Sequence, residues 1–449
     1  MQVTIVGGGS YQWTPELMAD LFATPSLHGL HLVLEDIEPE ALAKMEALAN
    51  RLNDTMGAGA VVSATSDQKR ALEGADFVIV TISTGGFESM AVDLEVPVRY
   101  GIRQTVGDTV GPGGISRSLR NVPVLVSIAK DMEELCPEAW LLNITNPMTC
   151  LTRAVCRETS IKTVGLCHEV GNWCLDLAIA LGKPSESVEV SVCGVNHFPV
   201  ITDLVVEGED GFSVLAEMVA SSGGLDSLAP RDGLLDAEPM SVMDFCRRHY
   251  LQLTLLDEWG TFPAAGDRHI AEFLPWILTA ETEWGASFNI SATTIADRMR
   301  DQDSFIQDVD KWLCGELPLQ TWQSGELPAP VIDSLITGMR RVIPANIPNA
   351  GQAVDLPAGV VVESMCVVDG DGICGRDQVT LRAPYAELVR RHVAVQELTV
   401  EAALNGDFNL AKAAFFLDPL AGRGSFQETG LMVEQLLEGT KNWLPNWDR

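Results

Sequence analysis

The stretch Val3-Thr4-Ile5-Val6-Gly7-Gly8-Gly9-Ser10 stands near the start of the chain and decides the fold. A run of apolar and β-branched residues enters three glycines directly, which predicts a buried strand, a tight turn and then a helix. Glycine lets the backbone approach a pyrophosphate, and the following helix offers unpaired N–H groups to it. Gln12 stands where the third glycine of the GxGxxG pattern would be, so a purely structural turn is the alternative interpretation.

A second apolar run, Leu32-Val33-Leu34-Glu35-Asp36, ends in carboxylates. An acidic side chain at the end of the second strand binds the ribose hydroxyls in dinucleotide-binding folds and favours NAD over NADP. Asp36 alone fits a solvent-facing strand end equally well, but together with the glycines it predicts an NAD site. Later strands would bring further polar residues to the same carboxyl edge. The predicted cofactor contacts are Gly7, Gly9, Ser10, Asp36, Ser83, Thr84 and Asn143.

Short apolar runs alternate with amphipathic helical patterns through residues 1–200. This alternation is typical of parallel βαβ units, so we expect an N-terminal, Rossmann-like, doubly wound parallel sheet that binds NAD. The expected strands are 2–6, 30–34, 77–82, 140–144, 163–167 and 188–195, and the expected helices are 15–22, 39–52 and 122–135.

Residues 201–449 have a different pattern, with longer helices and Gly- and Pro-rich joints. We expect a mixed α+β domain for substrate binding and oligomerisation there, as in lactate and malate dehydrogenases. No clear linker separates the two regions, so they should share an interface, and sites tend to lie in such interfaces. The expected helices are 241–256, 270–279, 294–313, 384–406 and 409–416, and the expected strands are 360–363 and 366–368.

The composition excludes several classes of function. The chain has 30 basic and 62 acidic residues and a net charge of −32, so it would be repelled by nucleic acid and by anionic membranes. Its apolar runs are too short to cross a bilayer, and its first residues resemble a strand rather than an export signal. We therefore expect a cytoplasmic protein. Its 10 cysteines lack CxxC spacing, which indicates free thiols.

Cys167 and His197 follow the ends of the strands expected at 163–167 and 188–195. If these strand ends are neighbours in one sheet, a thiolate and an imidazole could hold a divalent ion and leave coordination positions open for substrate oxygens. Either residue alone fits a packed core position. Asn146 precedes Pro147, which disfavours helical geometry at Asn146 and could turn its amide into the same cleft.

Motifs along essentially the whole chain resemble glycoside hydrolase family 4, the glycosidases that need NAD and a divalent metal. The resemblance rests on residues 7–10, Gly111-Pro112-Gly113-Gly114 with SRSLRNVP at 116–123, Thr145-Asn146-Pro147, Cys167-His168, Asn196-His197-Phe198, ELTVEAA at 397–403 and Asp418-Pro419-Leu420.

This resemblance implies an exception to glycoside hydrolysis by two carboxylates. In the family, NAD oxidises the sugar C3 hydroxyl, a base removes the acidified C2 hydrogen, the aglycone leaves by elimination, water adds, and the hydride returns. A metal, usually Mn²⁺, stabilises the enediolate. The implied metal ligands are Cys167 and His197, and the implied assembly is a homodimer or homotetramer.

The quartet Cys167-His168-Glu169-Val170 resembles the motif of the α-galacturonidase subgroup, which implies an α-galacturonide or related uronide as substrate. A neutral hexoside, α or β, is the alternative. His168 is our candidate for the acid that assists the leaving oxygen. Glu169, unexpected beside an anionic sugar, would bind a hydroxyl or orient the metal site.

The chain lacks the tyrosine-rich stretch that supplies the base in phosphosugar-cleaving members. Asp267 is therefore our candidate for the base, with Tyr250 as the second choice, although Asp267 also fits a helix cap. Arg268 could bind a carboxylate through its planar fork, or be a surface charge. Asn146 and Arg117 complete the predicted substrate contacts.

Two other classes of function remain open. An NAD-dependent hydroxy-acid dehydrogenase would accumulate NADH with its substrate, whereas a family 4 glycosidase would not. A redox-sensing protein that only binds NAD would be independent of metal.

Overall fold

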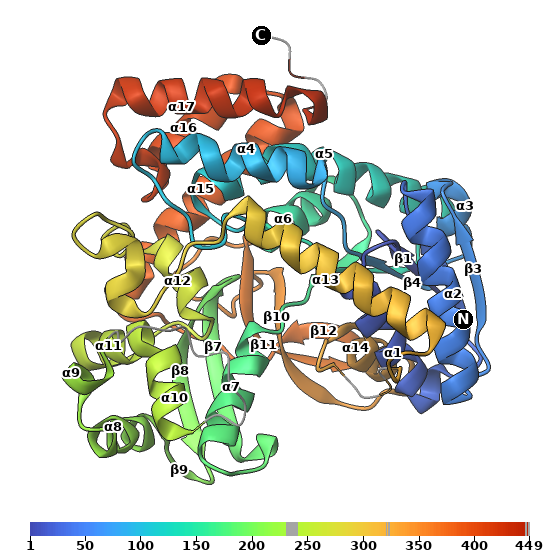
Figure 1. Ribbon diagram of the computed structural model, residues 1–449, viewed down its shortest axis with the longest axis horizontal. Helices are drawn as coiled ribbons and strands as arrows, with labels where there is room; N and C mark the ends of the chain where they lie inside the picture. The colour runs from blue at the N-terminus through green and yellow to red at the C-terminus, as the bar shows by residue number, and fades with distance from the viewer. Residues whose placement is uncertain (230–240, 320, 322–323, 445–446, 448–449) are drawn as a thin grey trace.

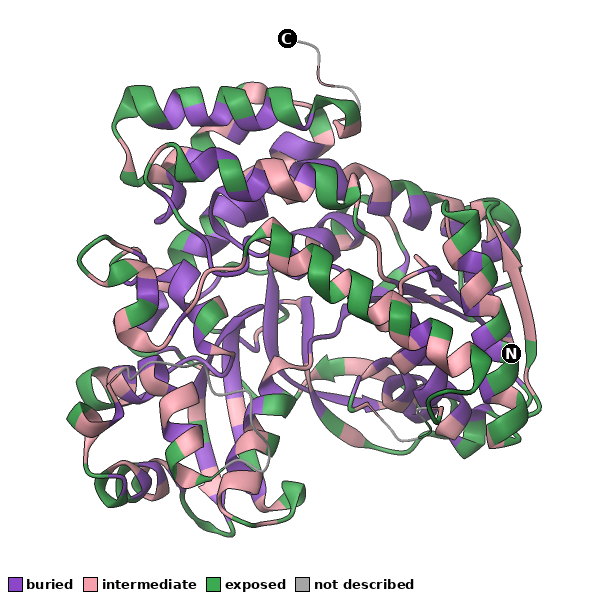
Figure 2. Ribbon diagram, viewed as in Figure 1, coloured by how far each residue is buried: buried purple, intermediate pink, exposed green. Residues whose placement is uncertain are grey.

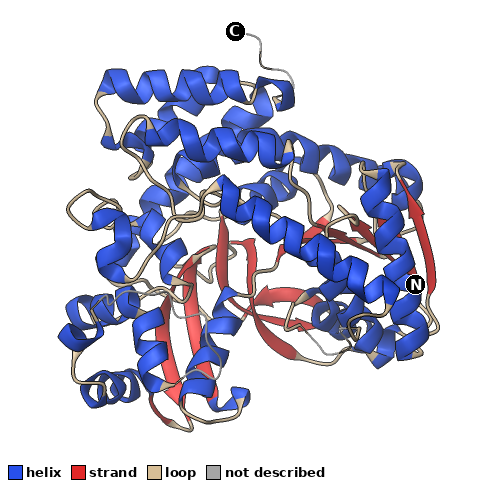
Figure 3. Cartoon of the chain, in the orientation of Figure 1, coloured by secondary structure: helices blue, strands red, loops and turns tan. Residues whose placement is uncertain are grey.

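The computed structural model describes residues 1–229, 241–319, 321, 324–444 and 447. Within these residues one 12-stranded mixed sheet runs through the molecule, with helices packed around it (Figures 1 and 3). The strands are β1 Gln2–Val6, β2 His31–Glu35, β3 Val61–Thr65, β4 Phe77–Val80, β5 Trp140–Asn143, β6 Lys162–Gly165, β7 Val188–Val195, β8 Phe198–Val206, β9 Glu209–Asp210, β10 Arg341–Pro348, β11 Val361–Asp369 and β12 Gly372–Gly375.

The first six strands lie in the order β3-β2-β1-β4-β5-β6 and all run parallel. This order confirms the expected doubly wound, Rossmann-like sheet. Strand β4 is buried along its whole length, as a strand covered by helices on both faces must be. The order reverses between β1 and β4, and ligands of such sheets bind outside the carboxyl ends of the strands at that place.

Beyond β6 the sheet continues with β10-β11-β7-β8-β9, paired antiparallel. Two strands from the C-terminal half, β10 and β11, thus lie between β6 and β7 (Figure 1). The expectation that the strands preceding Cys167 and His197 are neighbours is therefore wrong. A pairing across so many residues leaves no local pattern in the sequence. The β7–β8 hairpin also crosses the domain boundary expected at residue 200.

The helices follow the expected pattern in most places. Their bounds are α1 Trp13–Ala23, α2 Pro39–Met56, α3 Gln68–Leu72, α4 Gly86–Val98, α5 Gly111–Leu135, α6 Met148–Glu158, α7 Glu169–Ala180, α8 Gly211–Ser221, α9 Leu225–Leu228, α10 Val242–Arg248, α11 Tyr250–Trp259, α12 Asp267–Phe273, α13 Ile295–Cys314, α14 Pro328–Thr337, α15 Tyr385–Asn405, α16 Phe408–Leu417 and α17 Phe426–Gly439.

Four expected elements need correction. The helix expected at 241–256 is two helices, because His249 leaves helical geometry between α10 and α11. The helix expected at 270–279 ends at Phe273. The two strands expected at 360–363 and 366–368 are one strand, β11, in which even the polar Glu363 and Ser364 are buried. Burial on both faces removes the alternation that identifies a single strand in a sequence.

Helices bury their apolar faces against the sheet and each other, while their outer faces are exposed (Figure 2). The C-terminal helices α15, α16 and α17 pack on α4 and α5, so the last part of the chain covers the N-terminal half. No helix among the described residues is long and apolar enough to span a bilayer.

Candidate functional site

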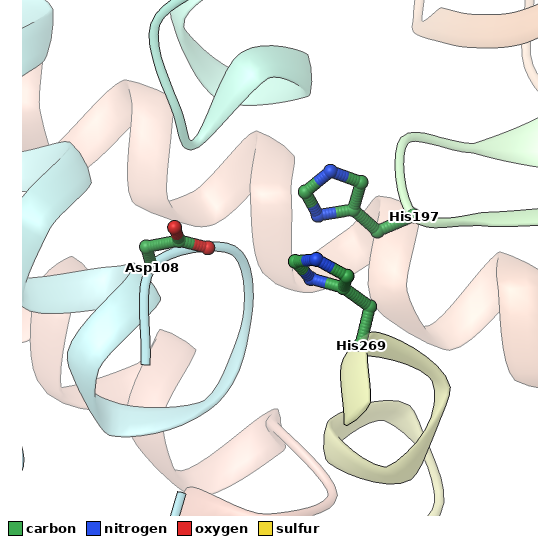
Figure 4. Close-up of side chains that lie close together, drawn as sticks. All are labelled: Asp108, His197 and His269. Carbon is green, nitrogen blue, oxygen red and sulfur yellow. The ribbon is translucent and has the colours of Figure 1, made fainter. Parts of the chain in front are cut away.

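Three side chains from distant parts of the chain meet in one group: Asp108, His197 and His269. Asp108 comes from the loop before α5, His197 from the β7–β8 hairpin and His269 from α12 (Figure 4). Each offers a ligand atom within 4.8 Å of the others. The imidazole rings of His197 and His269 lie with centroids 3.9 Å apart. Two imidazoles and a carboxylate are a donor set that suits a divalent transition metal.

His197 occupies the turn between β7 and β8, with a left-handed backbone at φ 65°. Its Nδ1 lies 2.8 Å from the Thr109 hydroxyl, which also donates to Asp108 at 2.7 Å. With that hydroxyl donating to the carboxylate, Nδ1 carries the imidazole proton and Nε2 keeps its lone pair. Burial lowers the pKa of His197 to about 3, so the ring is neutral at pH 7, as a metal ligand must be.

Cys167 lies just after β6, where it was predicted, and is buried. Burial raises the pKa of its thiol well above the usual value, and nearby Glu363 and Glu169 raise it further. The side chain of Asn196, next to His197, lies within hydrogen-bonding reach of the thiol. Cys167 does not belong to the Asp108–His197–His269 group, so its role as a metal ligand stays a prediction.

A second cluster surrounds His168, the residue before α7. Its Nδ1 lies 2.6 Å from Glu326 Oε1, its Nε2 lies 3.5 Å from Glu169 Oε1, and its ring faces Trp13 on α1. Burial lowers the pKa of His168, but the two carboxylates outweigh this effect and raise it to about 10. His168 is therefore an imidazolium held between two carboxylates.

Glu169 connects the two clusters. One carboxylate oxygen accepts a hydrogen bond from the backbone N–H of Gly266 at 2.6 Å, and the other lies 3.9 Å from His269 Nε2. Burial raises the pKa of Glu169, but the surrounding histidines outweigh it and hold the pKa well below its usual value. The Nδ1 atom of His269 is buried and has no hydrogen-bond partner among the described residues.

The structure does not bring Asp267 or Tyr250 into this group. The buried Asp267 carboxylate accepts hydrogen bonds from the backbone N–H groups of Leu251 and Gln252, at 2.7 and 3.3 Å. It thus caps the start of α11, whereas the alternative that the sequence left open was a cap of the helix that follows it, and Asp267 lies within that helix, α12. Tyr250 is the first residue of α11 and packs against Phe288.

Arg117 lies beside the group, whereas Arg268 is tied to neighbouring loops. Arg117 donates from Nε to the Asn146 carbonyl at 3.0 Å, and its guanidinium is among the charges that hold the pKa of Asp108 below its usual value despite burial. Arg268 donates from Nη2 to the Thr105 carbonyl at 2.9 Å. The Asn146 side chain accepts from the backbone N–H of Met148, so its amide oxygen is used within its own turn.

The N-terminal turn fits a dinucleotide. Gly7 has φ +88°, and a β-carbon there would lie 2.0 Å from the Thr81 carbonyl oxygen. A β-carbon at Gly9 would lie 2.8 Å from Asp36 Oδ2, which accepts a hydrogen bond from the Gly9 N–H. Gly7 therefore requires glycine, and at Gly9 a side chain would displace the Asp36 carboxylate. Ser10 accepts from the backbone N–H of Trp13 at the start of α1.

The remaining predicted cofactor contacts follow β4 and β5. Ser83 is exposed, and the backbone N–H of Thr84 is bonded to Asn121. The Asn143 amide is used inside its own turn, where Nδ2 donates to Thr145 and Thr152. Ser83 and Thr84 stay predicted contacts at this edge, while the geometry gives Asn143 a structural role.

The sequence analysis missed Asp108, Thr109 and Glu326. His269 stood in the Gly266-Asp267-Arg268-His269 quartet, but the neighbouring Asp267 was chosen instead. The sequence held no local signal that separates the two, because Asp267 is used by a contact with α11 that only the structure shows.

Comparison with known proteins identifies the family. Residues 2–182 match the family described as "Family 4 glycosyl hydrolase", and residues 192–421 match its C-terminal domain. An α-galacturonidase of Thermoanaerobacterium saccharolyticum is 34% identical, over 99% of this chain and 97% of that protein. An α-galactosidase of Bacillus subtilis is 31% identical, over 99% of both chains. A crystal structure from Bacillus subtilis, described as a glucosidase, is 31% identical and covers 97% of this chain and 99% of its own, with a TM-score of 0.86.

More distant structures share the fold. A 6-phospho-α-glucosidase from gut microorganisms, solved with NAD and Mn²⁺, is 19% identical with a TM-score of 0.82 over 100% of this chain and 99% of its own. A malate dehydrogenase from Plasmodium falciparum is 13% identical with a TM-score of 0.52 over 92% of this chain and 99% of its own, in line with the expected dehydrogenase-like fold. The two family matches together span most of the sequence, and the chain belongs to the family 4 glycosyl hydrolases.

Proposed function

We propose that this protein hydrolyses α-galacturonides or related uronides with the help of NAD and a divalent metal, with Mn²⁺ as the first candidate. The observation that carries the proposal is the position of Glu169, whose carboxylate lies between His168 and His269, while the tilted ring of His269 lies against that of His197. When bound, NAD supplies reversible hydride transfer at the sugar C3, and the metal supplies Lewis-acid polarisation of the sugar oxygens.

The glycine turn and Asp36 would hold NAD, because close backbone approach and a ribose-binding carboxylate meet at the carboxyl end of β1 and β2. His197 and Asp108 would hold the metal, together with the predicted ligand Cys167. The neutral His197 imidazole and the ionised Asp108 carboxyl are in the protonation states that coordination needs.

His269 replaces Asp267 as our candidate for the base that removes the C2 proton. Its Nδ1 is free of partners and its Nε2 faces the Glu169 carboxylate, an arrangement that orients the ring and stabilises the imidazolium formed after proton transfer. His168 is the candidate acid for the leaving oxygen, because the two neighbouring carboxylates keep it protonated. Tyr250 lies outside this arrangement.

Three observations support a uronide. The quartet Cys167-His168-Glu169-Val170 resembles that of α-galacturonidases, and the α-galacturonidase relative is 34% identical. The site also contains two cationic groups, the His168 imidazolium and the buried Arg117 guanidinium, that could attract a carboxylate. Arg268 remains a second candidate partner for the carboxylate.

A neutral hexoside is the second candidate, and a specific observation favours it. Besides Glu169 and Glu326, two acidic residues of α1 lie in this region: Glu16 and Asp20. Burial, together with the charges of Glu326 and Asp20, raises the pKa of Glu16 to about 7. So many carboxylates would disfavour an anionic sugar unless several of them are protonated or bonded.

Hydrolysis of a panel of aryl glycosides tests both proposals. The panel contains the α-galacturonide, α-glucuronide, neutral α- and β-hexosides and 6-phosphohexosides, each with and without NAD and Mn²⁺ under reducing conditions. We expect cleavage of the α-galacturonide that requires both additives, without accumulation of NADH. A preference for a neutral hexoside would select the second candidate. Steady NADH production without aglycone release would contradict a glycosidase and indicate a dehydrogenase.

A further inference from the structure

One residue from each of four neighbouring strands forms a row across the sheet, next to the site. Gly165 of β6 pairs with Asn346 of β10, Asn346 pairs with Glu363 of β11, and Glu363 pairs with Gly194 of β7. The first and last residues of this row stand just before Cys167 and His197 in the sequence. Strands β10 and β11, which carry the two middle residues, therefore lie between the two strands that lead to the predicted metal ligands (Figure 1).

Glu363 contacts the turn that carries His197. The Glu363 side chain is 1% exposed, and its Oε2 accepts a hydrogen bond from Asn196 Nδ2 at 3.1 Å. The same carboxyl group faces the backbone N–H of His197. Because the Asn196 side chain also reaches the Cys167 thiol, Glu363 is linked to both predicted ligands, by one contact to the His197 backbone and through one amide to Cys167.

The row also contains buried acceptors that the described residues leave unbonded. Glu363 Oε1, Asn196 Oδ1 and Asn346 Oδ1 have no hydrogen-bond partner. The Asn346 side chain lies within hydrogen-bonding reach of the Glu363 carboxyl group.

We propose that Glu363 is a positioning residue of the metal site, which holds the Asn196-His197 turn so that the imidazole of His197 stays directed at Thr109 and Asp108. His197 has a left-handed backbone, and such a conformation persists in a residue other than glycine only where its surroundings hold it. Groups that orient metal ligands in this way affect metal affinity without touching the ion. The inference rests on the metal of the proposed function.

Direct measurement of Mn²⁺ affinity shows whether the position of the Glu363 side chain or its negative charge supports the metal site. The probe is Mn²⁺ alone, titrated into the full-length protein, with free Mn²⁺ followed by electron paramagnetic resonance. Glu363→Gln keeps the side-chain length, can still accept from Asn196 and His197, and can donate to Asn346. Glu363→Asp keeps a carboxyl group on a side chain that is one methylene shorter. We expect Glu363→Gln to retain the affinity of the unaltered protein and Glu363→Asp to weaken it about 10- to 100-fold.

Asp333→Asn is the matched control. It changes another buried carboxylate, one bonded to Ser26 and Arg341 away from the row, and should leave Mn²⁺ affinity unchanged. NAD binding and thermal unfolding report whether each variant is folded. If Glu363→Asp does not fold, Asn196→Ser must show the same loss of Mn²⁺ affinity.

The possible results are distinct. Tight Mn²⁺ binding by Glu363→Asp together with weakened binding by Glu363→Gln would show that the negative charge of Glu363 matters rather than the position of its side chain. Equal Mn²⁺ affinity in all variants would show that Glu363 has no role in the metal site. Either result overturns the inference and leaves the proposed function intact. No Mn²⁺ binding by the unaltered protein would overturn the metal of the proposed function and this inference with it.

Discussion

The Nδ1 atom of His168 lies 2.6 Å from Oε1 of Glu326, which stands 158 residues further along the chain. Glu326 belongs to a segment fastened to α1, because Asp20 of that helix accepts from the backbone N–H of Ser324 at 2.7 Å. The helix that follows the glycine turn is thus connected to the candidate acid. Nucleotide-binding and substrate-binding elements share one hydrogen-bonded unit here.

Glu326→Ala should lower kcat/KM on the best glycoside about 10- to 100-fold, because a hydrogen bond to a charged group contributes roughly 1.5–3 kcal/mol. Without Glu326, His168 loses both the contact that fixes its ring and a charge that keeps it protonated. Glu326→Gln, which can still accept from Nδ1, should recover part of the loss. Glu434→Gln, on the exposed side of α17, serves as the control. Unchanged kcat/KM in Glu326→Ala would remove His168 from the mechanism.

His269→Gln should lower kcat by about 10²- to 10⁴-fold, the usual contribution of a general base. Glutamine fills a similar volume but cannot accept a proton at neutral pH. Steady-state kinetics should be combined with Mn²⁺ titration of the same variant. Retained Mn²⁺ affinity with lost kcat supports the base. Lost Mn²⁺ affinity would instead make His269 a metal ligand, which the Asp108–His197–His269 group also permits.

Asp267→Asn should leave kcat within a few-fold and lower the free energy of unfolding by about 1 kcal/mol, as expected for a weakened helix cap. Both oxygens of Asp267 accept backbone N–H groups of α11, and the asparagine variant keeps one of these acceptors. Chemical denaturation measures the stability, and the glycoside assay measures kcat. A loss of kcat of a hundredfold or more would return the role of base to Asp267.

Asp267 caps α11 whereas His269 belongs to the candidate site, a difference that the sequence alone did not predict. Local patterns were sufficient for most of the parallel half of the sheet: β1 has the expected bounds, and apolar runs mark every parallel strand except β3. β7, which pairs antiparallel, also has the expected bounds. β3 is only partly buried, so it lacks a strong apolar run. Local patterns also placed His168 and His197 at strand ends.

The missing parts depend on contacts between distant segments. β10 contains two prolines and enters between β6 and β7 by antiparallel pairing, which leaves no local signal. Asp108 lies in a loop whose next residue, Thr109, is hydrogen-bonded to His197, 88 residues away. Whether Asp267 or His269, two residues apart, caps a helix or faces the site depends on the helix packed beside them, which is α11.

Asp36→Ala should weaken NAD binding about 10-fold or more while changing NADP binding little, because the ribose hydroxyls lose a charged acceptor. The carboxylate also accepts from Gly9, so the variant loosens the turn that approaches the pyrophosphate. Isothermal titration calorimetry with both dinucleotides measures the change in selectivity. Glu38→Gln, two residues further along and exposed, is the control. Equal NAD affinity in Asp36→Ala would place the ribose elsewhere.

The free energy of unfolding should be largest at mildly acidic pH and fall as the pH rises toward 8. Burial raises the pKa of Glu35, Asp267 and Glu272 to about 7 and that of Asp418 to about 6. Between about pH 4 and 7 the folded state therefore binds protons that the unfolded chain has released, so stability falls as pH increases and levels off above the folded pKa values. The net charge of −32 acts in the same direction through self-repulsion.

Carboxyl groups whose pKa is lowered in the folded protein make the free energy of unfolding decrease at acidic pH. The pKa of Asp108 is held below its usual value, so its contribution to stability is lost only at lower pH, as it becomes protonated. The two groups of carboxyls act on opposite sides of about pH 4, so we expect the maximum in the melting temperature near that pH in scans at constant ionic strength. Asp267→Asn should flatten the decline by at most about 1.4 kcal/mol per pH unit, the contribution of one proton. A melting temperature that rises steadily from pH 5 to pH 8 would contradict this prediction. It would mean that the four buried carboxyl groups are ionised in the folded protein and that contacts other than those described here stabilise their charges.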